Sequence, residues 1–193
     1  MTAPPDRLPP GQYEAKDWPA LHFGDVPLVD LGAWRFRIHG AVGQERVLTY
    51  DEFRSLPTSR VHADFHCVTK FSVFDNDWDG VRVADVLALV EPDPGVSHVM
   101  VESVDDYTAN LPLAVFDDED TLFAWGRNGE DISAEHGWPL RLVVPKRYAW
   151  KSAKWVSGLE LLVGDRRGFW EERGYHNDAD PWREERYSYQ ESG

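Results

Sequence analysis

Cysteine is almost absent from this 193-residue sequence, because Cys67 is the only one. A single cysteine excludes an intrachain disulfide and any zinc or iron–sulfur site built from several cysteines of one chain. Long apolar runs are lacking too, since no stretch approaches the roughly 18 residues of a membrane span. The segment 1–10 also lacks the basic-then-apolar order of a secretory signal. We therefore expect a cytoplasmic protein without stable membrane insertion.

Basic side chains are scarce relative to acidic ones: 20 Lys and Arg stand against 34 Asp and Glu, for a net charge of −14. Such a surface repels phosphate backbones and anionic lipid headgroups, which argues against a nucleic-acid partner. Hydrophobic residues make up 42% and aromatic residues 13%, so the chain is not disordered or of low complexity. Length and composition predict one globular domain over residues 1–193.

The pattern of apolar residues predicts short helices among many strands. Thr49 with Glu52 three residues later is a capping-box signature for a short helix that stops at Pro57. A second short helix is predicted over 80–90, where valines and leucines recur at helical spacing. Alternation or apolar runs predict strands at five places: 34–40, 61–69, 98–104, 140–144 and 155–163. This order indicates an α+β fold with a mixed or antiparallel sheet.

The two ends of the chain differ from the middle. Residues 1–33 contain six prolines, so we expect an extended N-terminal arm with little regular structure. Residues 164–193 are rich in Arg, Glu, Trp and Tyr, which predicts a C-terminal tail that packs back on the body.

Cys67 lies at or just past the strand over 61–69. A thiolate can serve as a nucleophile, a redox group or a soft metal ligand, whereas a lone cysteine is also often a small buried hydrophobe. His66 points to the opposite side of a strand, so a nucleophilic pair with Cys67 needs a base from elsewhere, such as His39, His98 or His136.

A basic island occupies residues 135–156, EHGWPLRLVVPKRYAWKSAKWV, in an otherwise acidic chain. Arginine and lysine supply charge-assisted hydrogen bonds to phosphate, so the island predicts an anion site, although a solvated, salt-bridged loop has the same composition. The chain contains no glycine-rich phosphate loop, which argues against ATP and NAD.

These features together resemble the molybdopterin-binding domain of the sulfite oxidase superfamily. The resemblance rests on Cys67, on HGWPLR at 136–141 and on VPKRYAWKSAKW at 144–155. The tail over 168–187 and LHFGDVP at 21–27 are similar to the small single-domain bacterial members. The resemblance implies a sulfite-oxidase-like fold, molybdenum and molybdopterin as cofactors, and oxygen-atom transfer to or from a small-molecule substrate.

The resemblance also implies roles for particular residues. Cys67 becomes the protein thiolate on molybdenum. The residues implied to hold the pterin and its phosphate are His22, Phe23, Ser103, His136, Arg141, Lys151, Ser152, Ala153 and Lys154. The chain lacks the extra haem and dimerisation domains of the larger oxidases, which implies a separate electron-transfer protein as partner.

Two departures from the family pattern bear on the substrate. The Ala-Gly-Asn-Arg-Arg run that follows the cysteine in sulfite oxidases reads Val-Thr-Lys-Phe-Ser here, which leaves Lys70 as the one positive charge near Cys67. Relatives carry an active-site tyrosine where this chain has Trp125, and an indole cannot act as a phenol acid. We take Trp125, Lys70 and Phe71 as candidate substrate-pocket residues and rank S-oxides, then N-oxides, then sulfite as substrates.

Two other functions stay open at this point. One is a cofactor-free binding module that keeps the fold, although the retained Cys67 argues against loss of the metal. The other is a hydrolase or acyltransferase in which Cys67 pairs with a distant histidine.

Overall fold

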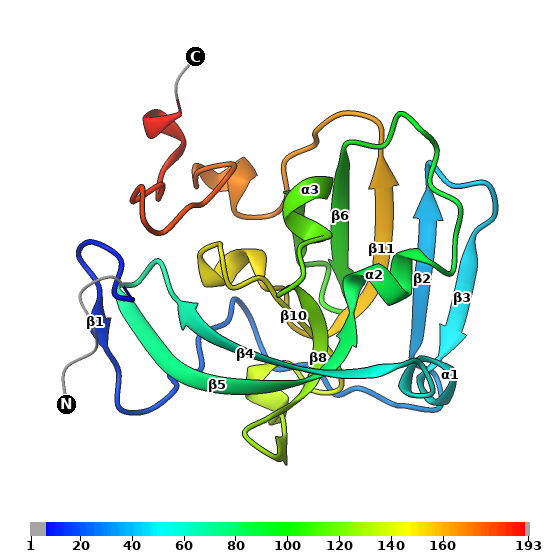
Figure 1. The fold of residues 1–193 in the computed structure, drawn as a ribbon, viewed down its shortest axis with the longest axis horizontal. Helices are drawn as coiled ribbons and strands as arrows, with labels where there is room; N and C mark the ends of the chain where they lie inside the picture. Colours follow the sequence, from blue (N-terminus) through cyan, green and yellow to red (C-terminus); the bar gives the residue numbers. More distant parts are fainter. Residues whose placement is uncertain (1–6, 192–193) are drawn as a thin grey trace.

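A computed structural model describes residues 7–191, which form two β-sheets joined by short helices (Figure 1). The first sheet contains β1 (Tyr13–Glu14), β4 (Thr58–His66), β5 (Phe71–Arg82), β8 (Leu122–Arg127), β9 (Glu130–Asp131) and β10 (Arg141–Val143). The second has the order β3-β2-β11-β6-β7. Its strands are β2 (Arg35–Gly40), β3 (Arg46–Thr49), β6 (His98–Ser103), β7 (Thr108–Pro112) and β11 (Val156–Leu162). Each sheet has one parallel pair among antiparallel ones, which confirms the predicted mixed α+β fold.

The helices are short and lie in the connections between strands. The α-helices are α1 (Tyr50–Arg54), α2 (Val83–Leu87) and α3 (Leu113–Phe116), and the 3-10 turns are η1 (Ala134–His136), η2 (Ala149–Lys151), η3 (Glu171–Arg173) and η4 (Ser188–Gln190). The capping box predicted for α1 is present, since Thr49 and Glu52 bond to each other's backbone N–H. Within residues 7–191 no helix is long and apolar enough to cross a membrane.

One hydrophobic core joins the two sheets. In β2 the predicted alternation is confirmed: Phe36 and Ile38 are fully buried, whereas Arg35 and Arg37 are exposed. Successive residues of β8 point to opposite faces of the first sheet. Its Phe123 therefore joins this main core, while its neighbours pack into a second cluster on the other face, around β4, β5 and Cys67.

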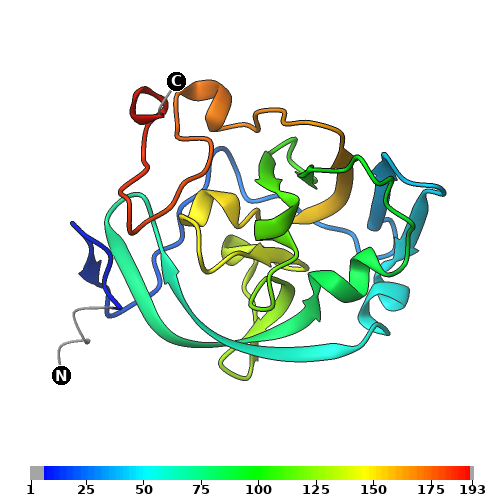
Figure 2. The same cartoon turned by 45° about the horizontal axis from the view of Figure 1, so that its top comes forward.

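The long hairpin β4–β5 curves along one side of the molecule and ends at Cys67 (Figures 1 and 2). Its second strand was not predicted from the sequence. The run Asp75-Asn76-Asp77 and the glycine at position 80 are uncommon in strands, yet β5 tolerates them through a positive φ of 55° at Asp75 and a register shift between Asp79 and Gly80.

The arm and the tail both lie against the tip of this hairpin (Figure 2). Residues 7–33 are irregular apart from β1, which pairs in parallel with the start of β5. Residues 1–6 of the expected arm and 192–193 of the expected tail lie outside the described residues. Residues 164–191 consist of turns, η3 and η4, and Trp170 and Tyr175 of this tail line a cavity that Cys67 also lines.

Candidate functional site

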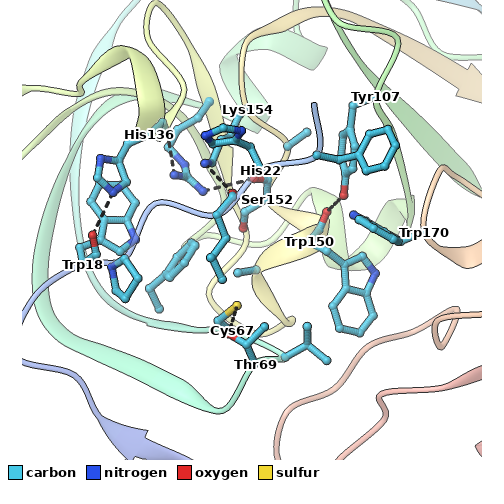
Figure 3. Close-up of a pocket in the computed structure, with 18 of the residues that line it drawn as sticks. Trp18, His22, Cys67, Thr69, Tyr107, His136, Trp150, Ser152, Lys154 and Trp170 are labelled. Carbon is cyan, nitrogen blue, oxygen red and sulfur yellow. Dashed lines mark hydrogen bonds between the residues drawn. The ribbon is translucent and has the colours of Figure 1, made fainter. Parts of the chain in front are cut away.

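A cavity of about 200 Å³ opens between the hairpin tip, the basic segment and the two chain ends (Figure 3). Aromatic side chains form much of its wall, and one thiol and several basic groups provide its chemistry. The polar and sulfur-bearing side chains at the cavity are His22, Cys67, Thr69, Asp105, Tyr107, His136, Arg141, Ser152, Lys154 and Tyr175. In Figure 3, Cys67 and Thr69 lie at the bottom of the view, and Lys154 and His136 lie at the top, across the cavity.

Cys67 is the first residue after β4 and begins a tight turn. Its N–H donates to the Phe71 carbonyl over 2.8 Å, and its own carbonyl accepts from the Lys70 N–H over 3.0 Å. The turn closes because Lys70 adopts a φ of 78°. Thr69 Oγ1 donates to Cys67 Sγ over 3.2 Å. The backbone thus fixes the thiol at the cavity, and one hydroxyl stabilises negative charge on it.

Arg141 is a buried cation at the cavity, with 1% of its surface exposed. Its guanidinium donates to the carbonyls of His136 over 2.8 Å and Ser152 over 3.2 Å. Burial, with a smaller effect of the Arg127 charge, lowers the pKa of Arg141 to about 9. Arginine nevertheless stays protonated at neutral pH, so a positive charge is held in a poorly solvated place.

Lys154 is the second cation of the cavity. Its ammonium donates to the carbonyls of Leu21 and Glu135, each over 2.7 Å. Burial and then the Arg141 charge lower its pKa to about 7. Within residues 7–191 neither Arg141 nor Lys154 forms an ion pair with a carboxylate, although the chain is strongly acidic. Two such charges favour an anionic ligand.

His136 and Gly137 shape the same region. The His136 ring stacks on Trp18 with centroids 3.9 Å apart, and its nitrogens lie 2.8 Å from Ser133 Oγ and 3.1 Å from the Trp18 carbonyl. Burial lowers the pKa of His136, so the ring is neutral at pH 7. Gly137 has a φ of 116°, and a Cβ there would lie 3.0 to 3.1 Å from the Cβ atoms of Arg141 and Lys154. Glycine therefore lets the two cations approach each other.

Eight of the residues expected from the sequence come together at this cavity. They are His22, Phe23, Cys67, His136, Arg141, Ser152, Ala153 and Lys154. Ser152 Oγ already accepts from the Val144 N–H over 3.0 Å, so its hydroxyl orders the segment as well as facing the cavity.

Of the three expected substrate-pocket residues, Phe71 lines the cavity and the other two lie elsewhere. Trp125 is on β8 and points to the face opposite Ala124, where it is 6% exposed in the main core under the Arg54 guanidinium at 4.1 Å. Lys70 is exposed on the outer side of the turn. Neither lines the cavity, because strand alternation and the turn conformation direct them away.

Ser103 and Lys151 do not line the cavity either. Ser103 ends β6, and its buried Oγ has no hydrogen-bond partner within the described residues. Lys151 is fully buried behind the wall, where its ammonium lies 2.6 Å from the Glu171 carboxylate and 2.8 Å from Asn110 Oδ1. The structure gives Lys151 a partner within the protein in place of a ligand.

Apart from Phe71, the sequence did not predict the aromatic wall. Its members are Trp18, Phe65, Phe71, Tyr107, Trp150, Trp155, Trp170 and Tyr175. They come from the arm, the hairpin, the connection between β6 and β7, the basic segment and the tail. The aromatic richness of the tail was a further signal, but it indicated packing without indicating a cavity.

The histidines of this region do not contact the thiol. Within residues 7–191, the side-chain hydrogen bond to Cys67 Sγ comes from Thr69, and no histidine nitrogen bonds to it. His66 instead lies 2.8 Å from Ser72 Oγ. The geometry therefore gives no support to a Cys-His nucleophile.

Comparison with known proteins agrees with this chemistry. The family model described as "Oxidoreductase molybdopterin binding domain" matches residues 23–170. The chain belongs to this family. It is a molybdopterin-dependent oxidoreductase, and both the cofactor and the enzyme class agree with the expectation from the sequence.

Three relatives illustrate the range of the family. "Uncharacterized oxidoreductase YuiH" of Bacillus subtilis is 38% identical over 95% of this chain and 93% of its own length. "Sulfite oxidase" of Arabidopsis thaliana is 30% identical over 79% of this chain and 48% of its own. "Putative protein-methionine-sulfoxide reductase subunit YedZ1" of Azospira oryzae is 27% identical over 80% and 60%. This chain thus spans nearly all of the first but about half of the second.

A solved structure supports the fold. The sulfane dehydrogenase SoxCD of Paracoccus pantotrophus superposes with a TM-score of 0.68 over 74% of this chain and 41% of its own, at 22% identity. The sulfite-oxidase-like molybdopterin-binding fold expected from the sequence is confirmed.

Proposed function

We propose that this enzyme removes an oxygen atom from small, uncharged S-oxides, with Cys67 as the protein ligand of molybdenum. One arrangement supports this proposal: a thiol at the cavity lies opposite Arg141 and Lys154, which form no ion pair with a carboxylate of residues 7–191. Thiolate is a soft ligand that suits molybdenum, and the basic groups suit the phosphate of molybdopterin. The donor set therefore fits the cofactor.

Arg141 and Lys154 hold the phosphate and pterin side of the cofactor in this proposal. Both side chains line the cavity and donate to backbone carbonyls, so they are oriented before the cofactor arrives. His136 and Ser152 complete this side, while His22 and Phe23 approach from the arm. Thr69 keeps its hydrogen bond to the Cys67 sulfur. When bound, the cofactor supplies a metal that changes oxidation state by two.

The wall on the Cys67 side favours an uncharged substrate. Phe71 and Ala149 pack in one hydrophobic cluster with Cys67, and Lys70, the expected positive charge, is exposed outside the cavity. Sulfite is a dianion or monoanion and needs positive charge to leave water, whereas a sulfoxide needs only an apolar wall and a hydrogen-bond donor. We therefore rank S-oxides before N-oxides and sulfite. The name of the Azospira relative, a putative protein-methionine-sulfoxide reductase subunit, is consistent with this order.

The net reaction is R₂S=O + 2 H⁺ + 2 e⁻ → R₂S + H₂O. The chain's own residues bind and orient the substrate and exclude water through the aromatic wall. The two electrons come from a separate electron-transfer protein in this proposal, and the cell compartment in which the two meet is expected to be the cytoplasm.

The first experiment measures metal and pterin in protein from a host that makes the molybdenum cofactor. We expect about one molybdenum per wild-type chain and a clear loss in Cys67→Ser. Reduced viologen then serves as the electron donor for dimethyl sulfoxide, methionine sulfoxide and trimethylamine N-oxide, and sulfite is tested with ferricyanide. Faster turnover of sulfite than of the oxides overturns the substrate ranking, and an equally loaded Cys67→Ser overturns the ligand assignment.

A further inference from the structure

The N-terminal arm and the C-terminal tail both donate hydrogen bonds to backbone carbonyls of the turn that carries Cys67. From the arm, Gln12 Nε2 donates to the Cys67 carbonyl over 3.0 Å, and the Tyr13 N–H donates to the Lys70 carbonyl over 2.9 Å. From the tail, Arg186 Nη1 donates to the carbonyl of Val68. These three hydrogen bonds, to the carbonyls of residues 67, 68 and 70, fix the backbone of the turn that begins at Cys67.

Arg186 is an unusual residue for such a place. It is 8% exposed, and its guanidinium lies over the Tyr148 ring at 4.8 Å. Its Nη2 is buried and has no hydrogen-bond partner within the described residues. The nearest carboxylate oxygen in an ion pair with it, on Glu184, is 3.9 Å away, and that side chain is 49% exposed. Burying a charge with so little compensation is costly.

The cost of burying the Arg186 charge is offset if negative charge lies on the cavity side of the turn, where the Cys67 side chain is. The Val68 carbonyl that Arg186 binds is one residue from Cys67, whose side chain faces the cavity. A thiolate there, joined to an anionic cofactor, places negative charge close to the guanidinium in a region shielded from water. Electrostatic attraction is strong under such conditions.

We propose that Arg186 is a positioning residue that holds the Cys67 turn and, through its permanent positive charge, raises the reduction potential of the metal. The proposal rests on the proposed role of Cys67 as the metal ligand. A fixed positive charge favours the more negative, reduced state of a nearby metal, and such outer contacts tune metal sites. Gln12 fixes the neighbouring carbonyl and carries no charge. Both residues lie outside the family-matched segment 23–170.

Substitutions at one position separate charge from geometry. Arg186→Lys keeps the charge but loses the planar fork, whereas Arg186→Gln keeps an N–H donor but loses the charge. Glu184→Gln removes a negative charge near the metal site and leaves Arg186 in place, so its effect on the reduction potential is opposite to that of Arg186→Gln. It therefore tests the proposal even where a change at Arg186 prevents folding. Arg183→Gln is the matched control, because Arg183 lies in the same tail but is 70% exposed.

The experiment uses purified holoenzyme and an EPR-monitored redox titration of the Mo(V) signal, with molybdenum and pterin content measured alongside. We expect a more negative potential and altered g-values in Arg186→Gln, a near wild-type potential in Arg186→Lys, and a more positive potential in Glu184→Gln. Arg183→Gln is expected to match wild type.

Two results overturn different parts of this account. Wild-type potential and spectrum in both Arg186→Gln and Glu184→Gln, at full metal content, overturn the role of Arg186. A Cys67→Ser protein with a wild-type Mo(V) signal overturns the ligand assignment on which the role depends.

Discussion

The Lys151 ammonium lies 2.6 Å from the Glu171 carboxylate, and both side chains are fully buried. Burial lowers the pKa of Lys151, while the Glu171 charge opposes this effect. The same carboxylate accepts from Trp150 Nε1 over 2.8 Å. This pair therefore ties η3 of the tail to η2, which carries part of the cavity wall.

Removing one partner of this pair is expected to be strongly destabilising. Lys151→Met leaves the Glu171 charge buried and unpaired, which costs about 3–5 kcal/mol of unfolding free energy. The double variant Lys151→Met, Glu171→Leu leaves no buried charge and is expected to recover most of the loss. Urea denaturation of the cofactor-free protein, followed by tryptophan fluorescence, measures both. Equal losses in the single and double variants contradict the ion-pair account.

Anion binding at the cavity is expected to weaken as pH rises through 7. The pKa of Lys154 is lowered to about 7, so its charge is present at pH 6 and mostly lost at pH 8. Arg141 stays charged over this range. If the charged form of Lys154 binds the anion, sulfate affinity falls about tenfold over these two pH units. Sulfate itself does not titrate in this range, so calorimetry on the cofactor-free protein reads the change directly.

Lys154→Met is the control for this prediction. It is expected to bind sulfate weakly and with little dependence on pH between 6 and 8. The pKa of His136 is lowered from its usual range, so any contribution from this ring appears only toward the acidic end. The same slope in Lys154→Met as in wild type excludes Lys154 as the titrating group.

His66 is expected to make the protein sensitive to mild acid. Its ring is 2% exposed, and burial lowers its pKa to about 4. The unfolded chain takes up this proton near pH 6.5 and the native protein only near pH 4, so stability is lost as pH falls between these values. Between pH 7 and 5 the loss is about 2 kcal/mol. Urea titrations of wild type and His66→Gln at both pH values measure it.

His62 provides a contrast on the same strand. The hydrogen bond to Asp77 raises the pKa of His62, so this residue adds stability as pH falls. Because His62 is exposed, the effect is small. His62→Gln is therefore expected to lose slightly more stability than wild type between pH 7 and 5, whereas His66→Gln loses less. An unchanged acid sensitivity in His66→Gln contradicts the assignment.

Local signals were predictable and long-range packing was not. The capping box of Thr49 and the alternation around Phe36 depend on neighbours in sequence, and both are present in the structure. The position of Cys67 at a strand end was predicted for the same reason. Trp125 was misplaced because the resemblance to an active-site tyrosine does not reveal which face of β8 the side chain occupies.

Whether a basic residue is ion-paired or faces the cavity also depends on partners that are distant in the sequence. Lys151 and Lys154 are three residues apart in one basic segment, yet one is paired with Glu171 and the other faces the cavity. Composition alone cannot separate them, because the deciding carboxylate comes from the tail. The same holds for Arg186, whose contact with the Cys67 turn joins residues 118 apart in sequence.

Thr69 is expected to tune the thiolate that it contacts. Its hydroxyl donates to Cys67 Sγ over 3.2 Å, and groups that bond to a metal ligand commonly change metal affinity or activity about 10–100-fold when removed. Thr69→Val removes the donor at nearly constant volume, so turnover or metal retention should fall by such a factor. Thr69→Ser keeps the hydroxyl and should stay near wild type. Metal content and viologen-coupled turnover distinguish them, and a loss in Thr69→Ser with none in Thr69→Val indicates packing of the methyl group, and not the hydrogen bond, as the cause.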